Sequence, residues 1–258
     1  MNIIHAIILG IIEGLTEFLP VSSTAHLILI GRLMGLADTD FLKTFEIIIQ
    51  FGAILAVLVY YAKRFLVDWD TNKKIIVAFI PTAIIGFALY KVIKQVFFGD
   101  YTLILWALIL GGIGLIIFEK MHDEERASVH EITAISYKQA FIIGCAQAIA
   151  VIPGVSRSGA TIVAGMLLGI RRRVIVEFSF LLAVPTMIAA SGYDLLKSHA
   201  GITSSGYGLI AAGFIAAFVA AYASIKFFLD YIKQHSFTAF GIYRIAFAGL
   251  MILLFAFL

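Results

Sequence analysis

Two glutamates on an otherwise apolar stretch are the first residues of this chain whose types and spacing suggest chemistry. Glu13 and Glu17 stand four positions apart, so a helix places both carboxylates on one face. At bilayer depth an ionisable side chain costs about 2.5–3.5 kcal/mol, and a second like charge adds repulsion. A divalent metal ion, Arg157 or a shared proton would relieve that repulsion. Oxygen ligands of this kind suit Mg²⁺ or Ca²⁺.

A cluster of hydroxyl groups follows the glutamates, at Ser22, Ser23 and Thr24. Serines at a helix start cap free backbone N–H groups, and those N–H groups also bind phosphate with the help of the helix dipole. His26 follows Ser23 by three positions, a spacing that suits a nucleophile with its base or a leaving-group acid. Capping alone would explain the serines and burial alone the histidine, but the nearby glutamates favour chemistry.

A second polar cluster reads P-G-V-S-R-S-G-A-T from Pro153 to Thr161. Arg157 presents a planar fork that suits bidentate contact with phosphate. Ser156, Ser158 and Thr161 add hydroxyl donors around it. The cluster therefore predicts a phosphate-binding loop. A purely structural pair between Arg157 and a glutamate is the alternative, and it would also bring the two clusters together.

The composition indicates the elements that must position these residues. The chain has 258 residues, 62% of them hydrophobic and 14% charged, against about 45–50% and roughly 25% in soluble domains. Apolar runs of about 20 residues, the length of a membrane-spanning helix, recur to the C-terminus. They lack the alternation of barrel strands. A net charge of +3 is too small to imply nucleic-acid binding, and the single Cys145 excludes an intramolecular disulfide.

Six of these runs predict membrane-spanning helices: Phe41–Tyr61, Ile75–Lys94, Leu103–Phe118, Val174–Leu196, Tyr207–Leu229 and Ala239–Leu258. Two other segments, Asn2–Gly35 and Tyr137–Ile170, each have two apolar arms too short to span a bilayer. Proline and hydroxyl residues separate the arms, and proline ends a helix, so each first arm should stop before Pro20 or Pro153. Such backbone is tolerated at membrane depth only inside protein or a water-filled cavity. Both segments are therefore predicted to be re-entrant helical hairpins.

The two hairpin segments resemble each other, and Glu13 aligns with Gln147. We interpret this as an internal repeat with halves of approximately 1–119 and 137–258, joined by a charged loop 120–136. Three spans follow each hairpin, so the halves have opposite orientation. The predicted fold is a single all-α polytopic membrane domain, with six transmembrane helices and two re-entrant hairpins in an inverted-topology repeat.

Positive charges assign a side to each end of the predicted helices. Five Lys and Arg residues fall on one face and thirteen on the other, with Arg157 left inside a polar break. The positive-inside rule makes the larger set cytoplasmic, which places both termini and the base of the first hairpin outside. The smaller set is Arg32, Lys43, Lys91, Lys94 and Lys197; the larger is Lys63, Arg64, Lys73, Lys74, Lys120, Arg126, Lys138, Arg171, Arg172, Arg173, Lys226, Lys233 and Arg244.

At its two polar clusters the sequence resembles the undecaprenyl-diphosphate phosphatase family, also called the bacitracin-resistance proteins. The resemblance rests on E-G-L-T-E-F-L-P-V-S-S-T-A-H-L (Glu13–Leu27) and on Pro153–Thr161. It continues through T-F-E-I-I-I-Q (Thr44–Gln50), E-F-S-F-L-L-A-V-P (Glu177–Pro185) and I-Y-R (Ile242–Arg244), and so covers essentially the whole chain.

The resemblance implies hydrolysis of undecaprenyl diphosphate to undecaprenyl phosphate and inorganic phosphate. That reaction recycles the lipid carrier of cell-wall synthesis and confers bacitracin resistance. The resemblance also implies a bacterial plasma (inner) membrane, a divalent cation and a site that opens to the external, periplasmic side. The family's functional positions fall on Glu13 and Glu17 for the acidic motif, on Ser23 and His26, and on Ser156, Arg157 and Thr161 for the phosphate-binding loop.

Two chemistries remain open from the sequence. Ser23 is the preferred nucleophile, with His26 as base or leaving-group acid, while Glu13 and Glu17 hold the metal and Arg157 binds the diphosphate. Alternatively, a metal-bound water attacks and Ser23 only binds phosphate.

Transport or flipping of polyprenyl phosphate is the alternative to hydrolysis, because broken helices that meet at the midplane are typical of transporters. Expected partners are the isoprenoid diphosphate and membrane lipids; a homodimer is compatible with the sequence.

Overall fold

The computed structural model describes residues 1–37, 39–90, 100–197 and 204–257, and this part of the chain is helical, without a strand. The α-helices are α1 (Ile3–Thr16), α2 (Ser23–Leu33), α3 (Asp40–Tyr60), α4 (Ala62–Val67), α5 (Trp69–Ala88), α7 (Tyr101–Met121), α8 (Tyr137–Gln147), α9 (Arg157–Leu167), α10 (Arg172–Lys197), α11 (Ser204–Tyr231) and α12 (Thr238–Ala256). Short 3-10 turns include η2 (Glu124–Arg126), η3 (Ile132–Ala134) and η4 (Ala148–Val151).

Six helices in the described residues are long and apolar enough to cross a membrane: α3, α5, α7, α10, α11 and α12. The prediction of six membrane-spanning helices is confirmed. The start of α5 differs from its predicted position at Ile75, because the Asp68 side chain accepts a hydrogen bond from the Thr71 N–H and begins the helix at Trp69. The predicted end of that span at Lys94, the charge of Lys91 and residue Leu258 lie outside the described residues.

Two pairs of shorter helices fill the space between the spans. Helices α1 and α2 pack against each other, as do α8 and α9, and each pair is joined by an irregular loop. We call residues 17–22 the first tip and residues 148–156 the second tip. Helix α1 ends at Thr16 and η4 at Val151, so both first arms stop before the prolines, as predicted.

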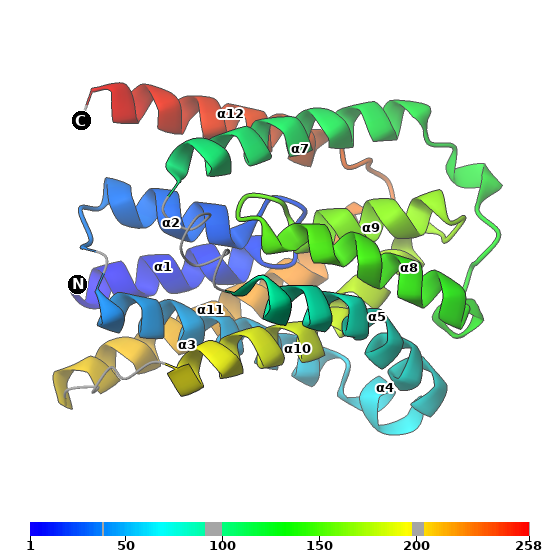
Figure 1. The fold of residues 1–258 in the computed structure, drawn as a ribbon, viewed down its shortest axis with the longest axis horizontal. Coiled ribbons are helices and arrows are strands. Elements are labelled where there is room, and N and C mark those ends of the chain that lie inside the picture. Colours follow the sequence, from blue (N-terminus) through cyan, green and yellow to red (C-terminus); the bar gives the residue numbers. More distant parts are fainter. Residues whose placement is uncertain (38, 91–99, 198–203, 258) are drawn as a thin grey trace.

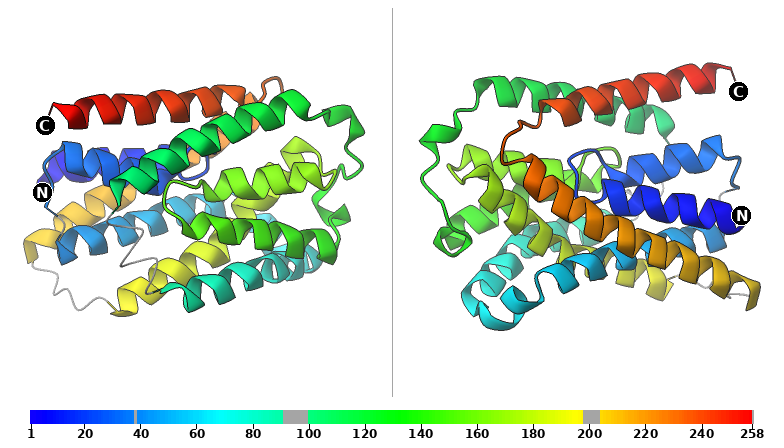
Figure 2. Two further views of the ribbon diagram at one scale, coloured as in Figure 1. Left: turned by 45° about the horizontal axis from the view of Figure 1, so that its top comes forward. Right: turned by 180° about the vertical axis from the view of Figure 1, so that it is seen from behind.

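The two pairs point at each other along the long axis of the molecule. The α1–α2 pair has its open end at the left of Figure 1 and the α8–α9 pair at the right, so that their tips meet near the centre. Both termini lie at the same end of the molecule (Figure 1). The views in Figure 2 show the same opposed arrangement, with α7 and α12 side by side along one edge.

Glycines allow the hairpin helices to pack closely on the spans. A Cβ atom at Gly14 of α1 would lie 2.4 Å from the Ala217 carbonyl oxygen of α11. A Cβ atom at Gly144 of α8 would lie 2.0 Å from the Ala78 carbonyl oxygen of α5. Close backbone approach at small residues is the usual way in which membrane helices associate. These contacts anchor one arm of each hairpin to a spanning helix.

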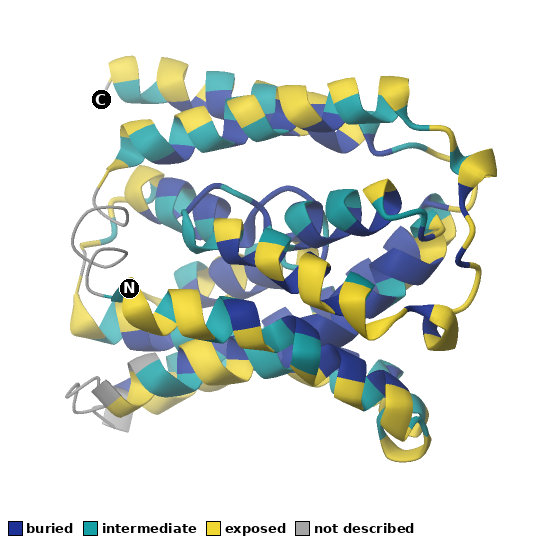
Figure 3. Ribbon diagram, turned by 45° about the vertical axis from the view of Figure 1, so that its right-hand side comes forward, coloured by how far each residue is buried: buried dark blue, intermediate teal, exposed yellow. Residues whose placement is uncertain are grey.

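The outer faces of the spans are apolar, and the interior holds the polar groups. Large exposed side chains on α7 include Trp106, Leu110 and Ile117. Figure 3 shows exposed residues on the outward faces of the helices and buried ones along their inner faces. A continuous apolar exterior around a partly polar interior is the pattern expected of a protein with lipid as its solvent.

Candidate active site

The entry to α2 has a strained backbone. Ser22 has φ 71° and ψ 91°, and it is the one non-glycine residue with positive φ in the described part of the chain. Such conformations cost about 1–3 kcal/mol and cluster at functional sites. Ser22 occupies the N-cap position of α2, as predicted, but its hydroxyl makes no capping hydrogen bond. The reason is the positive φ, since a capping side chain needs an extended backbone to reach the first-turn N–H groups.

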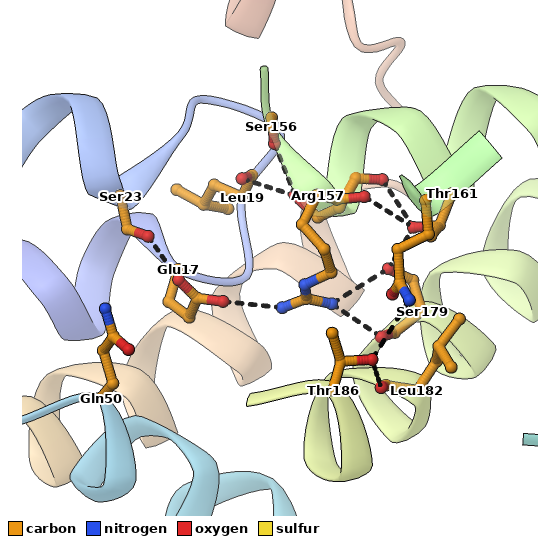
Figure 4. Close-up of polar contacts among 12 residues, drawn as sticks. Glu17, Leu19, Ser23, Gln50, Ser156, Arg157, Thr161, Ser179, Leu182 and Thr186 are labelled. Carbon is orange, nitrogen blue, oxygen red and sulfur yellow. Dashed lines mark hydrogen bonds and ion pairs between the residues drawn. The ribbon is translucent and has the colours of Figure 1, made fainter. Parts of the chain in front are cut away.

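Glu17 of the first tip is the acceptor that joins the two hairpins. The Ser23 hydroxyl donates a hydrogen bond to Glu17 Oε2 (Figure 4). Arg157 Nη2 donates to Glu17 Oε1 at 2.8 Å, with side chains only 13% and 9% exposed for Arg157 and Glu17. One carboxylate therefore contacts the hydroxyl group of the first cluster and the guanidinium of the second.

The other edge of the Arg157 fork contacts α10. Arg157 Nη1 donates to the Ser179 carbonyl oxygen at 2.8 Å, as Figure 4 shows. Arg157 Nε is buried and has no hydrogen-bond partner. The guanidinium is thus fixed in position by Glu17 and Ser179, and its Nε–H is left without a hydrogen-bond partner among the described residues.

The hydroxyl groups of the second cluster bind protein atoms. Ser156 caps α9 by accepting from the Gly159 N–H at 3.1 Å, which confirms the predicted cap. Ser158 donates to the Leu19 carbonyl oxygen at 2.7 Å and so ties α9 to the first tip. Thr161 shares a 2.7 Å hydrogen bond with the Ser179 hydroxyl. All three predicted phosphate ligands are buried, and each has a structural partner.

His26 is buried between α2 and α12. Its Nδ1 lies 2.8 Å from the Ser22 carbonyl oxygen and its Nε2 lies 2.8 Å from the Tyr243 hydroxyl. The Phe247 ring stacks on the imidazole with a centroid distance of 4.1 Å. Both ring nitrogens therefore have partners, and the Ser23 hydroxyl donates to Glu17 instead. In the described part of the chain, the structure shows no hydrogen bond between Ser23 and His26, the pair that the sequence spacing suggested as nucleophile and base.

Glu13 is the residue that most needs a further partner. It is completely buried, and neither of its carboxylate oxygens has a hydrogen-bond partner. Its charged neighbours are Glu17, Glu46 and Arg157. Two orphaned, buried carboxylate oxygens fit a hard cation, which accepts such ligands. The described residues contain no group of three or more His, Cys, Asp or Glu side chains arranged for a metal, so water or substrate oxygens would have to complete the set.

Arg244 of α12 belongs to the site, although the charge count had assigned it to the cytoplasmic end of its helix. It was counted among the cytoplasmic charges, yet it is 3% exposed in the interior. Its guanidinium donates to carbonyl oxygens of Pro20 at 3.3 Å and Gly154 at 2.9 Å, one in each tip. It also donates to Ala107 and Leu108 of α7. These acceptors offset the loss of hydration of the buried charge. An arginine inside an apolar span was the signal that could have identified it.

Two other residues join the site from α10 and α12. Ser179 accepts from Arg157 and shares a hydrogen bond with Thr161, while Tyr243 contacts His26. Both fall in motifs that carried the family resemblance, but their spacing gave no reason to connect them with the polar clusters. Glu177, two residues earlier on α10, pairs instead with Arg64 and Arg173.

The helical fold and the joined clusters define a polytopic membrane protein with a buried, charged site suited to an anion. The sequence model of the bacitracin resistance protein BacA matches residues 6–250, and the chain belongs to that family. The undecaprenyl-diphosphatase of Aquifex aeolicus is 50% identical over 241 residues, 93% of this chain and 94% of that protein. The undecaprenyl-diphosphatase of Persephonella marina is 49% identical over 255 residues, 99% of each. That of Wolinella succinogenes is 50% identical over 245 residues, 95% of each.

Proposed function

We propose that this chain is a membrane phosphatase that converts undecaprenyl diphosphate to undecaprenyl phosphate and inorganic phosphate. The observation that carries the proposal is the line of contacts from Ser23 through Glu17 to Arg157. It supports the proposal because Glu17, a proton acceptor, contacts both the hydroxyl that we propose as nucleophile and the guanidinium that we propose binds phosphate. The names of relatives about 50% identical to the chain supply the substrate. Bacitracin resistance and recycling of the cell-wall lipid carrier follow from this activity.

In the proposed reaction, Arg157 binds the diphosphate and the Ser23 hydroxyl oxygen attacks the terminal phosphorus. The Ser23 proton passes to Glu17, the acceptor of its hydrogen bond. The bond between the terminal phosphorus and the bridging oxygen breaks, and undecaprenyl phosphate leaves. Water then hydrolyses the phosphoserine and releases inorganic phosphate. Direct attack by water, with Ser23 only binding phosphate, is the competing route.

Glu13, together with Glu17, would hold a divalent cation, Mg²⁺ or Ca²⁺. Glu13 offers two oxygens without partners, whereas both Glu17 oxygens already accept hydrogen bonds. When bound, the ion neutralises negative charge on the diphosphate. Glu13 is therefore the principal ligand in this proposal, and Glu17 is a ligand only when Arg157 or Ser23 releases one of its oxygens.

The arrangement of the hairpins supports the proposed topology. Both pairs are re-entrant in this proposal, and the opposed directions of α1–α2 and α8–α9 fit an inverted repeat (Figure 1). The loop 120–136 is cytoplasmic, both termini lie outside, and the site opens to the external side of the bacterial plasma membrane. The isoprenoid tail leaves sideways between helices into lipid. A homodimer remains a prediction from the sequence.

Phosphate release by the purified chain tests the proposal. In detergent with a C55 or shorter prenyl diphosphate and Mg²⁺ or Ca²⁺, the wild type should release inorganic phosphate, since hydrolysis needs no second compartment. Ser23→Ala should lose at least about 100-fold of that activity if Ser23 is the nucleophile. Ser128→Ala, at an exposed serine outside both clusters, is the matched control.

Absence of phosphate release by the wild type with every substrate and cation would refute the enzyme assignment. Ser23→Ala activity within about tenfold of wild type would favour attack by water.

A further inference from the structure

Tyr243 is the residue of α12 that completes the surroundings of His26. Its hydroxyl lies 2.8 Å from His26 Nε2, and its ring lies nearly parallel to the imidazole, with an interplanar angle of 2°. Phe247, one turn later, stacks on the imidazole as well. The imidazole is 1% exposed and Tyr243 is 44% exposed. The tyrosine hydroxyl is therefore the contact of the buried imidazole with a more exposed side chain.

The partners of the two ring nitrogens determine where the protons of His26 lie. A carbonyl oxygen only accepts hydrogen bonds, so the contact with Ser22 places a proton on Nδ1. In the neutral ring Nε2 is then the acceptor, and the Tyr243 hydroxyl donates to it. Arg244 is the charged neighbour of this pair on α12.

We propose that Tyr243 is a positioning residue for His26, which fixes the orientation of the imidazole and donates the hydrogen bond that Nε2 accepts. The inference rests on the proposed phosphatase function, in which Glu17 accepts the Ser23 proton and His26 keeps the acid–base role predicted from the sequence. Ser22 and the stacked Phe247 hold one edge and one face of the ring, and Tyr243 holds the other nitrogen. The Tyr243 hydroxyl thus occupies the one ring nitrogen that the Ser22 carbonyl oxygen does not hold.

Tyr243→Phe tests this inference, because it removes the hydroxyl and keeps the stacked ring. A hydrogen bond of this kind contributes about 0.5–1.5 kcal/mol, so kcat should fall by up to about tenfold while KM stays within about twofold. The pH profile of kcat should change as well, since Nε2 loses its donor. Tyr207→Phe, at a 61% exposed tyrosine of α11, removes a hydroxyl outside the site and is the matched control.

A double-mutant cycle separates an effect through His26 from an independent one. In a His26→Gln background, the further change Tyr243→Phe should cost less than about twofold in kcat. Equal costs of Tyr243→Phe in the wild-type and His26→Gln backgrounds would overturn the inference. So would a Tyr243→Phe enzyme with wild-type kcat and pH profile.

Nitrogen-15 spectra of histidine-labelled protein provide a readout that does not need activity. The His26 signals are identified by their loss in His26→Gln. In the wild type they should show Nδ1 protonated and Nε2 as an acceptor, and Tyr243→Phe should shift the Nε2 signal. An unshifted Nε2 signal would contradict the proposed contact. If the wild type releases no phosphate, the phosphatase proposal fails, while this spectrum still decides whether Tyr243 positions His26.

Discussion

The carboxylate of Glu17 has two partners of different kinds, which makes it the most constrained side chain of the site. One oxygen accepts from Ser23 and the other from Arg157. Removal of one partner of a partly buried ion pair leaves the other charge without compensation. Glu17 therefore contributes both to the proposed reaction and to the joining of the two tips.

Glu17→Gln should abolish most activity and also lower thermal stability. The amide cannot take the Ser23 proton and leaves Arg157 without its anion. We expect a loss of at least about 100-fold in phosphate release together with a lower Tm. Thermal unfolding in detergent and the phosphate assay measure the two effects. Glu125→Gln, at an exposed glutamate beyond α7, is the control. Unchanged activity with an unchanged Tm would contradict the role of Glu17.

Glu13→Gln should change how the protein responds to divalent cations. Because both Glu13 oxygens are buried without partners, wild type should gain thermal stability when Mg²⁺ or Ca²⁺ is added after chelation. The glutamine variant removes the charge, and its Tm should not rise with the cation. A rise in Tm equal to that of wild type would show that the cation binds elsewhere.

At the scale of elements, Arg244 holds the tips against α7 and α12. Its guanidinium lies close to Gly111 of α7, where a Cβ atom would be 2.1 Å from Nη2. The hydrogen bonds to the Ala107 and Gly154 carbonyl oxygens leave that nitrogen little freedom to move. A glycine on a spanning helix thus provides the space for a side chain that binds both hairpins.

Gly111→Ala should lower both stability and activity without changing a charged residue. The added methyl group displaces the Arg244 guanidinium from its carbonyl partners, so we expect a lower Tm and about a tenfold loss of phosphate release. Gly114→Ala on the same helix is the matched control, because a Cβ atom there has nothing within 4 Å. Equal effects of the two substitutions would show that displacement of the Arg244 guanidinium is not responsible.

At the scale of the whole molecule, the two ends of the bundle should lie on opposite sides of the membrane. Ala37, next to the end of α2, and Ser128, in the loop after η2, are both exposed. In a Cys145→Ala background, Ala37→Cys should react with an impermeant thiol reagent added from outside. Ser128→Cys should react only when the cytoplasmic side is opened. The reverse pattern, or reaction of both from one side, would contradict the proposed topology.

The sequence by itself determined the class of structure. Lipid offers no hydrogen bonds to the backbone, so apolar runs of sufficient length must be helices, and the six spans and the family were predicted correctly. Proline alone was a weaker signal, because α5 and α10 continue through Pro81 and Pro185. The breaks at the tips combined proline with hydroxyl groups and ionisable residues, which need protein partners at depth. The metal, the homodimer and the membrane orientation remain predictions.

The tertiary structure alone decided which polar groups are partners. Arg157 and Glu17 are 140 residues apart, and their contact depends on the packing of four hairpin helices against the spans. The same packing directs Ser23 to Glu17, His26 to Tyr243 and Arg244 into the interior. Sequence spacing specifies neighbours within one helix. Partners across helices are selected by which donors and acceptors remain unsatisfied once the apolar faces have packed.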